Sequence, residues 1–266
     1  MAGTAPSYGP EHERGTLAAV RVAAITDIHS NLPALEAVLG AIDDAAVDEI
    51  WCLGDVIGYG AEPDECADLV RQNCAICLVG NHDLAVLGAL DVAAFSEAAA
   101  EAVAWTRENV AERTLALLRE LEPQGEREGI ALFHASPRDP VWEYVLSAEQ
   151  ADGCFDAQPK RIALIGHSHV SLFFVRPAAG EKEDEIHGAQ AGDDTLLDLA
   201  AGCWLINPGS VGQPRDGDPR AAWLELDTGE QTARFHRVAY DVDRAAASIV
   251  SAGLPRRLAD RLQVGS

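Results

Sequence analysis

The sequence is short of positive charge. Its 266 residues include 20 lysine and arginine residues against 43 aspartate and glutamate residues, which gives a formal net charge of −23 at pH 7. A polyanion would meet long-range repulsion from such a chain. The composition therefore argues against long nucleic acids and anionic membranes as partners. Lysine occurs only as Lys160 and Lys182, and this bias towards arginine, together with abundant alanine, suggests a GC-rich bacterial source.

Long hydrophobic runs are also missing. No stretch approaches the roughly 18 consecutive apolar residues of a membrane span, and the apolar stretch Leu17–Ile25 is interrupted by Arg21. Residues 1–16 hold no apolar segment of the kind found in signal peptides, so we expect a disordered tail there. We predict one domain over residues 17–266, a cytoplasmic location and no membrane partner.

Closely spaced cysteines are scarce. Among the six cysteines, Cys74 and Cys77 form the one pair with the spacing of a zinc-binding motif. A structural zinc site would need a second pair at similar spacing, and the sequence has none. Several of the other cysteines fall inside apolar runs, where a reduced thiol packs as a small hydrophobic group. We therefore expect buried, reduced cysteines, as in a cytoplasmic protein.

Short β-rich runs alternate with helical patterns through the first two thirds of the chain. Strands buried on both faces are predicted at Val20–Thr26, Glu49–Leu53, Ala75–Val79, Gly129–Phe133 and Arg161–Ile165. Helices are predicted at Pro33–Asp44, Glu65–Gln72 and, as one long helix or two, Ala93–Glu122. This order is typical of an α/β fold with a largely parallel sheet.

The pattern changes after Gly166, where short strands follow one another with little room for helices. They are predicted at Ser171–Val175, Leu196–Leu199, Cys203–Asn207, Ala221–Asp227 and Thr232–Val238. We expect these strands to form an antiparallel second sheet. The Gly-rich, acidic stretch Ala178–Asp194 is predicted to be an exposed loop, and Asp241–Ala252 a helix.

Metal-ligating residue types follow each of the five strands predicted in the first part of the chain. In order, they are Asp27 and His29, Asp55, Asn81 and His82, His134, and His167 and His169. The carboxyl ends of parallel strands share one edge of a sheet, so these side chains are expected to meet there. In an extended loop, the first and third side chains of Asp-x-His and of His-x-His point the same way, so each pair can coordinate one ion. This donor set suits Mn, Fe, Zn or Ni.

The ordered series of motifs resembles the calcineurin-like metallophosphoesterases, in particular their small bacterial YfcE-like phosphodiesterase branch. The motifs are Asp27-x-His29, Gly54-Asp55, Gly80-Asn81-His82-Asp83, His134 and Gly166-His167-x-His169. The match runs from about Arg21 to Leu262. The resemblance implies an α/β protein, a four-layer α/β/β/α sandwich of two mixed sheets, with a dinuclear metal site.

The resemblance also implies a role for each residue of the series. One divalent ion would be held by Asp27, His29 and His169, the other by Asn81, His134 and His167, and both by a bridging Asp55. His82 matches the family's non-ligand histidine, which faces the substrate phosphate and assists the leaving group. Asp83 would orient His82 or its loop, or would cap the helix that begins near it.

A dinuclear site of this kind predicts hydrolysis of a small phosphoester. Two cations can bind a phosphate together and lower the pKa of a water between them, which then attacks phosphorus. His82, if protonated, would give a proton to the departing oxygen. A phosphodiester is favoured over a monoester because the resembling branch suggests it.

Two further segments supply candidate substrate contacts. Asn207, Ser210 and Arg215 lie in a turn-rich loop after a strand, and the resembling family has a similar loop beside its metals. These residues are candidates for contacts to substrate or to the metal-ligand loops, although the pattern also fits a tight irregular turn. Arg138 follows His134 closely and is a fourth candidate, although a surface lid around Trp142 is the alternative interpretation.

Other functions remain open on the sequence. A phosphomonoesterase, or a protein or dinucleoside polyphosphate phosphatase, would use the same metal core. Those phosphatases carry Gly-Asp-x-x-Asp-Arg-Gly and Gly-Asn-His-Glu, whereas this chain has Gly-x-Gly after Ile57 and Asp83 after His82. A non-catalytic scaffold of the same fold is a third option, and it would be expected to lose ligands that are present here.

Overall fold

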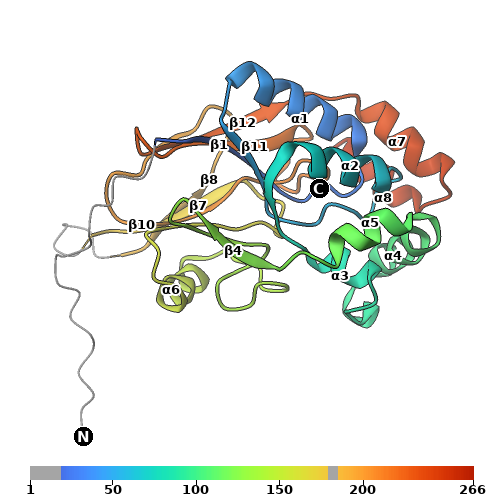
Figure 1. The fold of residues 1–266 in the computed structure, drawn as a ribbon, viewed down its shortest axis with the longest axis horizontal. Helices are drawn as coiled ribbons and strands as arrows, with labels where there is room; N and C mark the ends of the chain where they lie inside the picture. Colours follow the sequence, from blue (N-terminus) through green and yellow to red (C-terminus); the bar gives the residue numbers. More distant parts are fainter. Residues whose placement is uncertain (1–18, 179–184) are drawn as a thin grey trace, which may run out of the picture.

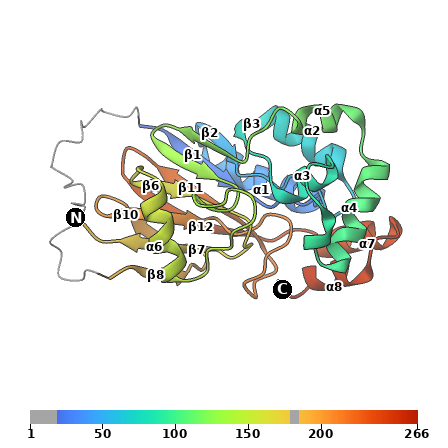
Figure 2. The same ribbon diagram turned by 90° about the horizontal axis from the view of Figure 1, so that it is seen from below.

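Two mixed six-stranded sheets lie face to face at the centre of the computed structural model, which describes residues 19–178 and 185–266 (Figures 1 and 2). The strand order in the first sheet is β3 (Cys74–Cys77), β2 (Glu49–Cys52), β1 (Arg21–Ile25), β11 (Ala221–Asp227), β12 (Thr232–Val238) and β9 (Leu196–Asp198). The order in the second sheet is β4 (Gln124–Arg127), β5 (Ile130–Phe133), β6 (Ile162–Leu164), β10 (Cys203–Asn207), β7 (Leu172–Arg176) and β8 (His187–Gln190). The tail predicted over residues 1–16 lies outside the described residues.

Helices cover the outer faces of both sheets. The helices are α1 (Leu32–Ala45), α2 (Pro63–Asn73), α3 (Asn81–Val86), α4 (Glu97–Asn109), α5 (Glu112–Leu118), α6 (Ala148–Ala157), α7 (Val242–Ser251) and α8 (Arg256–Leu262), with a 3₁₀ turn at Val92–Ala94. Helices α1 and α2 pack on the first sheet, and α6 packs on the second. The predicted four-layer α/β/β/α sandwich is confirmed. None of the helices in the described ranges has the length and apolar composition needed to cross a bilayer.

Strand β1 shows why the sandwich needs residues that are apolar on both faces. Val22 and Ala24 point into the core between the two sheets, while Ala23 and Ile25 face α1 and α2. All four side chains are fully buried. The prediction of buried faces is wrong for β3, which is a half-exposed edge strand with only one neighbour in its sheet.

The predicted division into a parallel sheet and a later antiparallel sheet is wrong. Strands β1, β2 and β3 run parallel in the first sheet, but β5 and β6 pair in the second. The later strands are shared between both sheets, because β11 pairs antiparallel with β1 and β10 pairs parallel with β6. The carboxyl ends of the early strands therefore meet from two sheets and not along one sheet edge.

The region 93–122, for which the sequence predicts one long helix or two, forms two helices, and the amide N–H of Ala111 between them donates to the Asp64 carboxylate at 3.1 Å. Other elements depart from the sequence prediction. Residues 187–190, predicted within an exposed loop, form β8 by pairing antiparallel with β7. Strand β4 and helices α6 and α8 were also not predicted. Their short, polar or Gly-containing sequences carry a weak pattern, and neighbouring elements stabilise them.

A buried ion pair ties the second half of the fold together. The guanidinium of Arg237, on β12, contacts the Asp216 carboxylate, and the two side chains are 3% and 5% exposed. The same guanidinium donates to the Ser171 hydroxyl at 2.9 Å, and the Ser171 amide donates to Asp216 at 3.1 Å. This network anchors the residues that follow Arg215 to both sheets.

We expect Arg237→Ala to lower the free energy of unfolding by about 3–5 kcal/mol, because it leaves the Asp216 carboxylate buried without its cation. Urea unfolding monitored by circular dichroism measures the loss. Arg220→Ala is the matched control: Arg220 also pairs with two aspartates, but its side chain is 40% exposed. The control should cost less than about 1 kcal/mol. Equal losses in the two variants would contradict this account.

Candidate metal centre

The predicted metal ligands come together where loops from the two sheets meet. Asp27 and His29 follow β1, Asp55 follows β2, Asn81 begins α3 after β3, His134 follows β5, and His167 and His169 follow β6. All seven side chains are buried. Their donor atoms form two groups that could each hold an ion, one with Asp27, His29, Asp55 and His169 and one with Asp55, His134 and His167.

The first group is closely spaced around one point. The Oδ1 atom of Asp27 lies 3.5 Å from Nε2 of His169 and 3.9 Å from Nε2 of His29. The two imidazole Nε2 atoms lie 3.1 Å apart. Nitrogen lone pairs at this separation repel one another unless a proton or a cation lies between them. The donor set therefore fits a divalent ion.

The second group shares one atom with the first. Oδ2 of Asp55 lies 3.5 Å from Nε2 of His29 and 3.7 Å from Nε2 of His134. The carboxamide oxygen of Asn81 lies 3.1 Å from Nε2 of His134, which adds an oxygen donor to this group. One carboxylate oxygen thus faces both groups, which is the placement that a bridging ligand requires.

In both Asp27 and Asp55, one carboxylate oxygen accepts hydrogen bonds from the protein and the other accepts none. Oδ2 of Asp27 accepts from the Thr26 hydroxyl and from the His167 amide, both at 3.0 Å. Oδ1 of Asp55 accepts from the His82 amide at 2.8 Å. Asp27 Oδ1 and Asp55 Oδ2 are buried without a hydrogen-bond partner. A buried acceptor without a partner is costly, so these two oxygens also fit cations.

The ligand imidazoles are oriented by backbone carbonyl groups. The Nδ1 atoms of His29, His134 and His169 lie 3.3, 3.0 and 2.6 Å from the carbonyl oxygens of Ile57, Leu53 and Gln213, respectively. A carbonyl can only accept, so each Nδ1 carries the proton and each Nε2 keeps its lone pair for an ion. In His167 the two nitrogens have the opposite roles. Its Nε2 lies 3.2 Å from the Trp142 carbonyl oxygen and carries the proton, so its Nδ1 keeps the lone pair for an ion.

The backbone at the ligands lies in the left-handed region of φ/ψ space. Asp27, His29, Asp55, His167 and His169 have φ between 51° and 64°. This conformation costs energy for residues other than glycine and persists only where the surroundings impose it. Here the surroundings are inter-loop hydrogen bonds, including those from the Asp27 and His29 amides to the carbonyls of Gly54 and Asp55, both at 3.0 Å.

Asp83 connects two of the ligand loops. Its carboxylate accepts from the amides of Val56 and Ile57, after Asp55, at 3.2 and 3.0 Å. It also accepts from the Gly80 amide at 3.0 Å, just before α3. The expected capping of α3 is therefore observed, and the same carboxylate fixes the loop that carries Asp55, a role that the sequence did not predict.

Burial dominates the electrostatics of the site. It raises the pKa of Asp27 to about 7, and it raises the pKa of Asp55 well above its usual range, with the nearby Asp83 carboxyl adding to the rise. Burial lowers the pKa of His29 and His169 well below the usual range. Without cations, the site therefore favours protonated carboxyls and neutral imidazoles.

His82 lies against the first group without joining it. Its ring packs edge-on against the His29 ring, with centroids 4.9 Å apart, and lies 4.3 Å from the Tyr59 ring. Nδ1 is sealed beside Gly58 and has no hydrogen-bond partner. Burial, followed by the charge of Arg215, lowers the pKa of His82 well below its usual range, so the ring is neutral in the substrate-free chain.

Arg215 brings positive charge to the same place. Its amide donates to the His169 carbonyl at 3.0 Å. Its guanidinium donates to the Tyr59 hydroxyl at 3.3 Å and to the Gln213 side-chain oxygen at 2.9 Å. The Nε–H group is buried without a partner, and no carboxylate among the described residues pairs with this arginine. Arg215 can therefore contact an anion beside the two groups.

The other three candidate substrate residues are placed differently. The Asn207 side chain donates to the Gly166 carbonyl at 2.7 Å, and the Ser210 hydroxyl donates to the Asp27 carbonyl at 2.8 Å. Both residues are fully buried, and these hydrogen bonds support the loops that carry the candidate ligands. Arg138 is exposed and forms an ion pair with Glu143, which leaves its charge neutralised.

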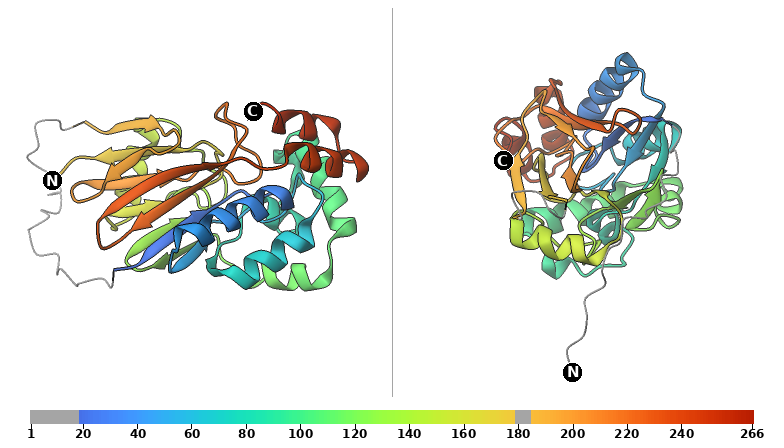
Figure 3. Two further views of the ribbon diagram at one scale, coloured as in Figure 1. Left: turned by 90° about the horizontal axis from the view of Figure 1, so that it is seen from above. Right: turned by 90° about the vertical axis from the view of Figure 1, so that its left-hand side faces the viewer.

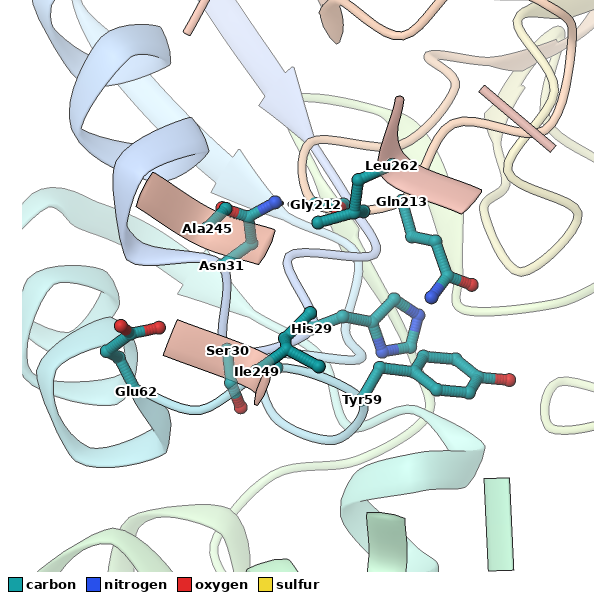
Figure 4. Close-up of a pocket in the computed structure, with 11 residues that line it drawn as sticks. His29, Ser30, Asn31, Tyr59, Glu62, Gly212, Gln213, Ala245, Ile249 and Leu262 are labelled. Atoms are coloured by element: carbon teal, nitrogen blue, oxygen red, sulfur yellow. Dashed lines mark hydrogen bonds between the residues drawn. The ribbon is translucent and has the colours of Figure 1, made fainter. Parts of the chain in front are cut away.

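Tyr59 and Gln213 were missed by the sequence reasoning, whereas Tyr144 was considered as a possible substrate contact beside Arg138. Tyr59 and Gln213 flank the His29 imidazole (Figure 4), and the Tyr59 and His29 rings meet at 4.7 Å. Tyr144 stacks on His167 with ring centroids 4.2 Å apart and is 42% exposed. Tyr59 follows Gly58 in the motif after β2, but neither its position nor that of Gln213 carries a pattern that predicts contact with a histidine.

Comparisons with known proteins agree with this geometry. Residues 20–229 match the calcineurin-like phosphoesterase superfamily domain. The crystal structure of a metallophosphoesterase from Sphaerobacter thermophilus is 39% identical, over 93% of this chain and 100% of that chain, with a TM-score of 0.83. An uncharacterized protein of Methanocaldococcus jannaschii is 37% identical over 252 residues, which are 92% of this chain and 98% of that protein.

One further similarity covers a short part of the chain. A symmetrical bis(5′-nucleosyl)-tetraphosphatase of Actinobacillus pleuropneumoniae is 35% identical over 69 residues, which are 25% of this chain and 26% of that protein. The family predicted from the motifs is confirmed by the superfamily match.

We expect the purified protein to bind two divalent ions per chain, and Asp55→Asn to bind at most one. The reason is that the substitution removes the charged oxygen that faces both groups of donors. Elemental analysis of dialysed protein measures the stoichiometry. Asp91→Asn, which replaces an exposed aspartate that caps a 3₁₀ turn, is the control and should keep both ions. Two tightly held ions in Asp55→Asn would contradict the bridging role.

Metal affinity should rise with pH through the neutral range. Burial raises the pKa of Asp27 to about 7, so below that pH the carboxyl holds a proton that an ion must displace. Below about pH 7 the apparent association constant should therefore fall by about tenfold for each unit by which the pH is lowered, for each proton released, and binding should release protons. Calorimetric titration of metal-free protein at several pH values, in two buffers, measures both. A pH-independent affinity would be incompatible with this site.

Proposed function

This chain belongs to the calcineurin-like phosphoesterase superfamily, and we propose from that premise that it is a metal-dependent phosphodiesterase acting on small phosphodiesters. The observation that supports the proposal most directly is the unpartnered Oδ2 of Asp55, which faces two separate groups of buried ligands. An arrangement of two groups around one shared carboxylate oxygen suits two ions and one phosphate between them.

We assign the ligands to two ions. Asp27, His29 and His169 would hold the first, and Asn81, His134 and His167 would hold the second, with Asp55 shared. When bound, two divalent ions supply the Lewis acidity that activates a water molecule and neutralises charge on a phosphate. Burial contributes because electrostatic interactions strengthen where water is excluded.

The protein's own residues complete the proposed reaction. As the oxygen of the attacking water bonds to phosphorus and the ester phosphorus–oxygen bond breaks, His82 in its imidazolium form would give the Nε2 proton to the departing alkoxide oxygen, because its other nitrogen is sealed beside Gly58. A bound phosphate counteracts the burial that keeps this ring neutral, since negative charge favours the imidazolium ion. Arg215 contacts a non-bridging oxygen of the phosphate and orients it.

A dinucleoside polyphosphate phosphatase is the second candidate within the superfamily. It is favoured by the 69-residue similarity to the bis(5′-nucleosyl)-tetraphosphatase of Actinobacillus pleuropneumoniae. The presence of Asp83 discriminates only weakly between a phosphodiesterase and a dinucleoside polyphosphate phosphatase. Its carboxylate accepts hydrogen bonds from the loop after Asp55 and from the start of α3, and it does not face the ligands. A scaffold without catalysis finds no support in the described residues, since every expected ligand and His82 are present and buried.

His82→Ala should lower kcat towards a chromogenic diester such as bis(p-nitrophenyl) phosphate by about 10²–10⁴-fold, the usual contribution of a general acid. The assay uses protein loaded with Mn, Fe, Zn or Ni in turn. Bound metal should stay at the wild-type level, because His82 is not assigned as a ligand. Steady-state kinetics together with elemental analysis separates loss of chemistry from loss of metal.

Arg138→Gln is the control for that experiment. Arg138 is exposed and its charge is already paired with Glu143, so kcat/KM should stay within about threefold of wild type. Wild-type activity in His82→Ala would overturn the proposed role of His82. Activity confined to phosphomonoesters would overturn the assignment as a diesterase.

A further inference from the structure

Three aromatic side chains run along one side of the candidate metal centre. The ring of Phe95 packs edge-on against the His82 ring, with centroids 4.9 Å apart, and edge-on against the Trp142 ring at 5.1 Å. Trp142 lies edge-on to His167 at 6.4 Å, and Tyr144 stacks on His167 at 4.2 Å. This aromatic strip of Phe95, Trp142 and Tyr144 therefore reaches from the histidine beside the first group of ligands to a histidine of the second group.

The strip joins parts of the chain that are distant in sequence. Phe95 ends the 3₁₀ turn before α4, whereas Trp142 and Tyr144 lie in the loop between β5 and α6. Figure 3 shows the green helices α4 and α5 at the same end of the molecule as the red helices α7 and α8, beyond the strands. The contact between Phe95 and Trp142 thus connects this helical end to a loop of the second sheet.

Packing of the core does not account for the whole strip. Among the described residues, the hydrophobic clusters of the core include Phe95 but neither Trp142 nor Tyr144. Tyr144 is 42% exposed, and it is the one aromatic residue among the exposed large hydrophobic residues in the described ranges. One face of its ring stacks on His167, so the exposed part of the ring is available to a second ring. Contact with such a ring would remove apolar surface from water.

Hydrogen bonds fix the backbone that carries Trp142 and Tyr144. The amides of Val141 and Trp142 both donate to Oδ1 of Asp139 at 3.1 Å. The Trp142 carbonyl oxygen lies 3.2 Å from Nε2 of His167. An aromatic side chain whose backbone is already fixed loses little conformational entropy when it contacts a ligand.

We propose that Tyr144 stacks on a planar aromatic ring in the organic part of the substrate. The proposal rests on the proposed function, because a phosphate held between the two groups of ligands fixes where the organic part begins. One ester group then extends along the aromatic strip, where rings in offset stacking or edge-to-face contact attract one another. The substrate class is a phosphodiester with an aryl group or a nucleobase on one ester group. The net charge of −23 still disfavours a long nucleic acid, so the ring belongs to a small ester.

Binding of two phosphonates to the manganese-loaded protein tests the aromatic contact without turnover. Phenylphosphonate and cyclohexylphosphonate have carbon–phosphorus bonds that a phosphoesterase does not hydrolyse, and their rings are planar and puckered, respectively. Calorimetric titration measures both affinities. The wild type should prefer phenylphosphonate. Tyr144→Leu keeps an apolar side chain without the ring, and it should reduce the ratio of the two affinities by about fivefold.

Tyr144→Phe and Leu146→Ala are the controls for that titration. Tyr144→Phe keeps the ring and should keep the preference for phenylphosphonate. Leu146→Ala changes a 55% exposed side chain of the same loop and should also leave the preference unchanged. A change in metal occupancy alters both affinities alike, so their ratio reports the ring. Elemental analysis and thermal unfolding establish that each variant holds its metal and its fold.

Kinetics distinguish a nucleobase from a simple aryl group. The substrates are the p-nitrophenyl esters of thymidine 5′-monophosphate and of 1,2-dideoxyribose 5-phosphate, which differ in the base alone. If the ring is a nucleobase, Tyr144→Leu should lower the ratio of the two kcat/KM values by about tenfold, the usual loss for one stacked base. An unchanged ratio together with a lost phenylphosphonate preference supports the aromatic contact with an aryl ester as the substrate.

The two proposals fail separately. A phenylphosphonate preference that is the same in folded, metal-loaded Tyr144→Leu and wild type overturns the aromatic contact, even if the diesterase is active. A protein that is inactive towards every diester, yet prefers phenylphosphonate through Tyr144, overturns the diesterase function and leaves the aromatic contact supported.

Discussion

The structure depends on two carboxylate oxygens that are buried and lack a partner, Asp27 Oδ1 and Asp55 Oδ2. A folded chain avoids such atoms unless something else compensates them. The surrounding loops hold these two oxygens in place, because the second oxygen of each carboxylate accepts hydrogen bonds from backbone amides. Histidine nitrogens with free lone pairs surround them, so the local donor set fits cations.

The same constraint explains why the ligand loops are so closely connected. Left-handed backbone at five ligands is unfavourable when considered one residue at a time. Hydrogen bonds between loops of different strands, and the Asp83 carboxylate between two of them, impose the conformation. Asn207, at the end of β10, and Ser210, in the loop after it, do the same. Polar residues near such a site can therefore hold the backbone of the ligand loops by hydrogen bonds without contacting a substrate.

Sequence reasoning identified the candidate ligands that the structure brings together, because each one follows a predicted strand with a strong hydrophobic pattern. It did not place the strands in their sheets, since β1 pairs with β11 about 200 residues later and no local pattern encodes that choice. For the same reason it could not find Tyr59 beside His29, because this contact joins the loop after β1 to the loop after β2. It also could not tell whether Asn207 faces solvent or a backbone carbonyl.

The origin of the ligands in both sheets has a mechanical consequence. Asp27 and His29 extend from the first sheet, whereas His134, His167 and His169 extend from the second. Ions held between these residues would cross-link the two sheets of the sandwich. Their binding energy would then add to the cohesion of the two sheets, so an organism short of metal would lose folded protein as well as activity.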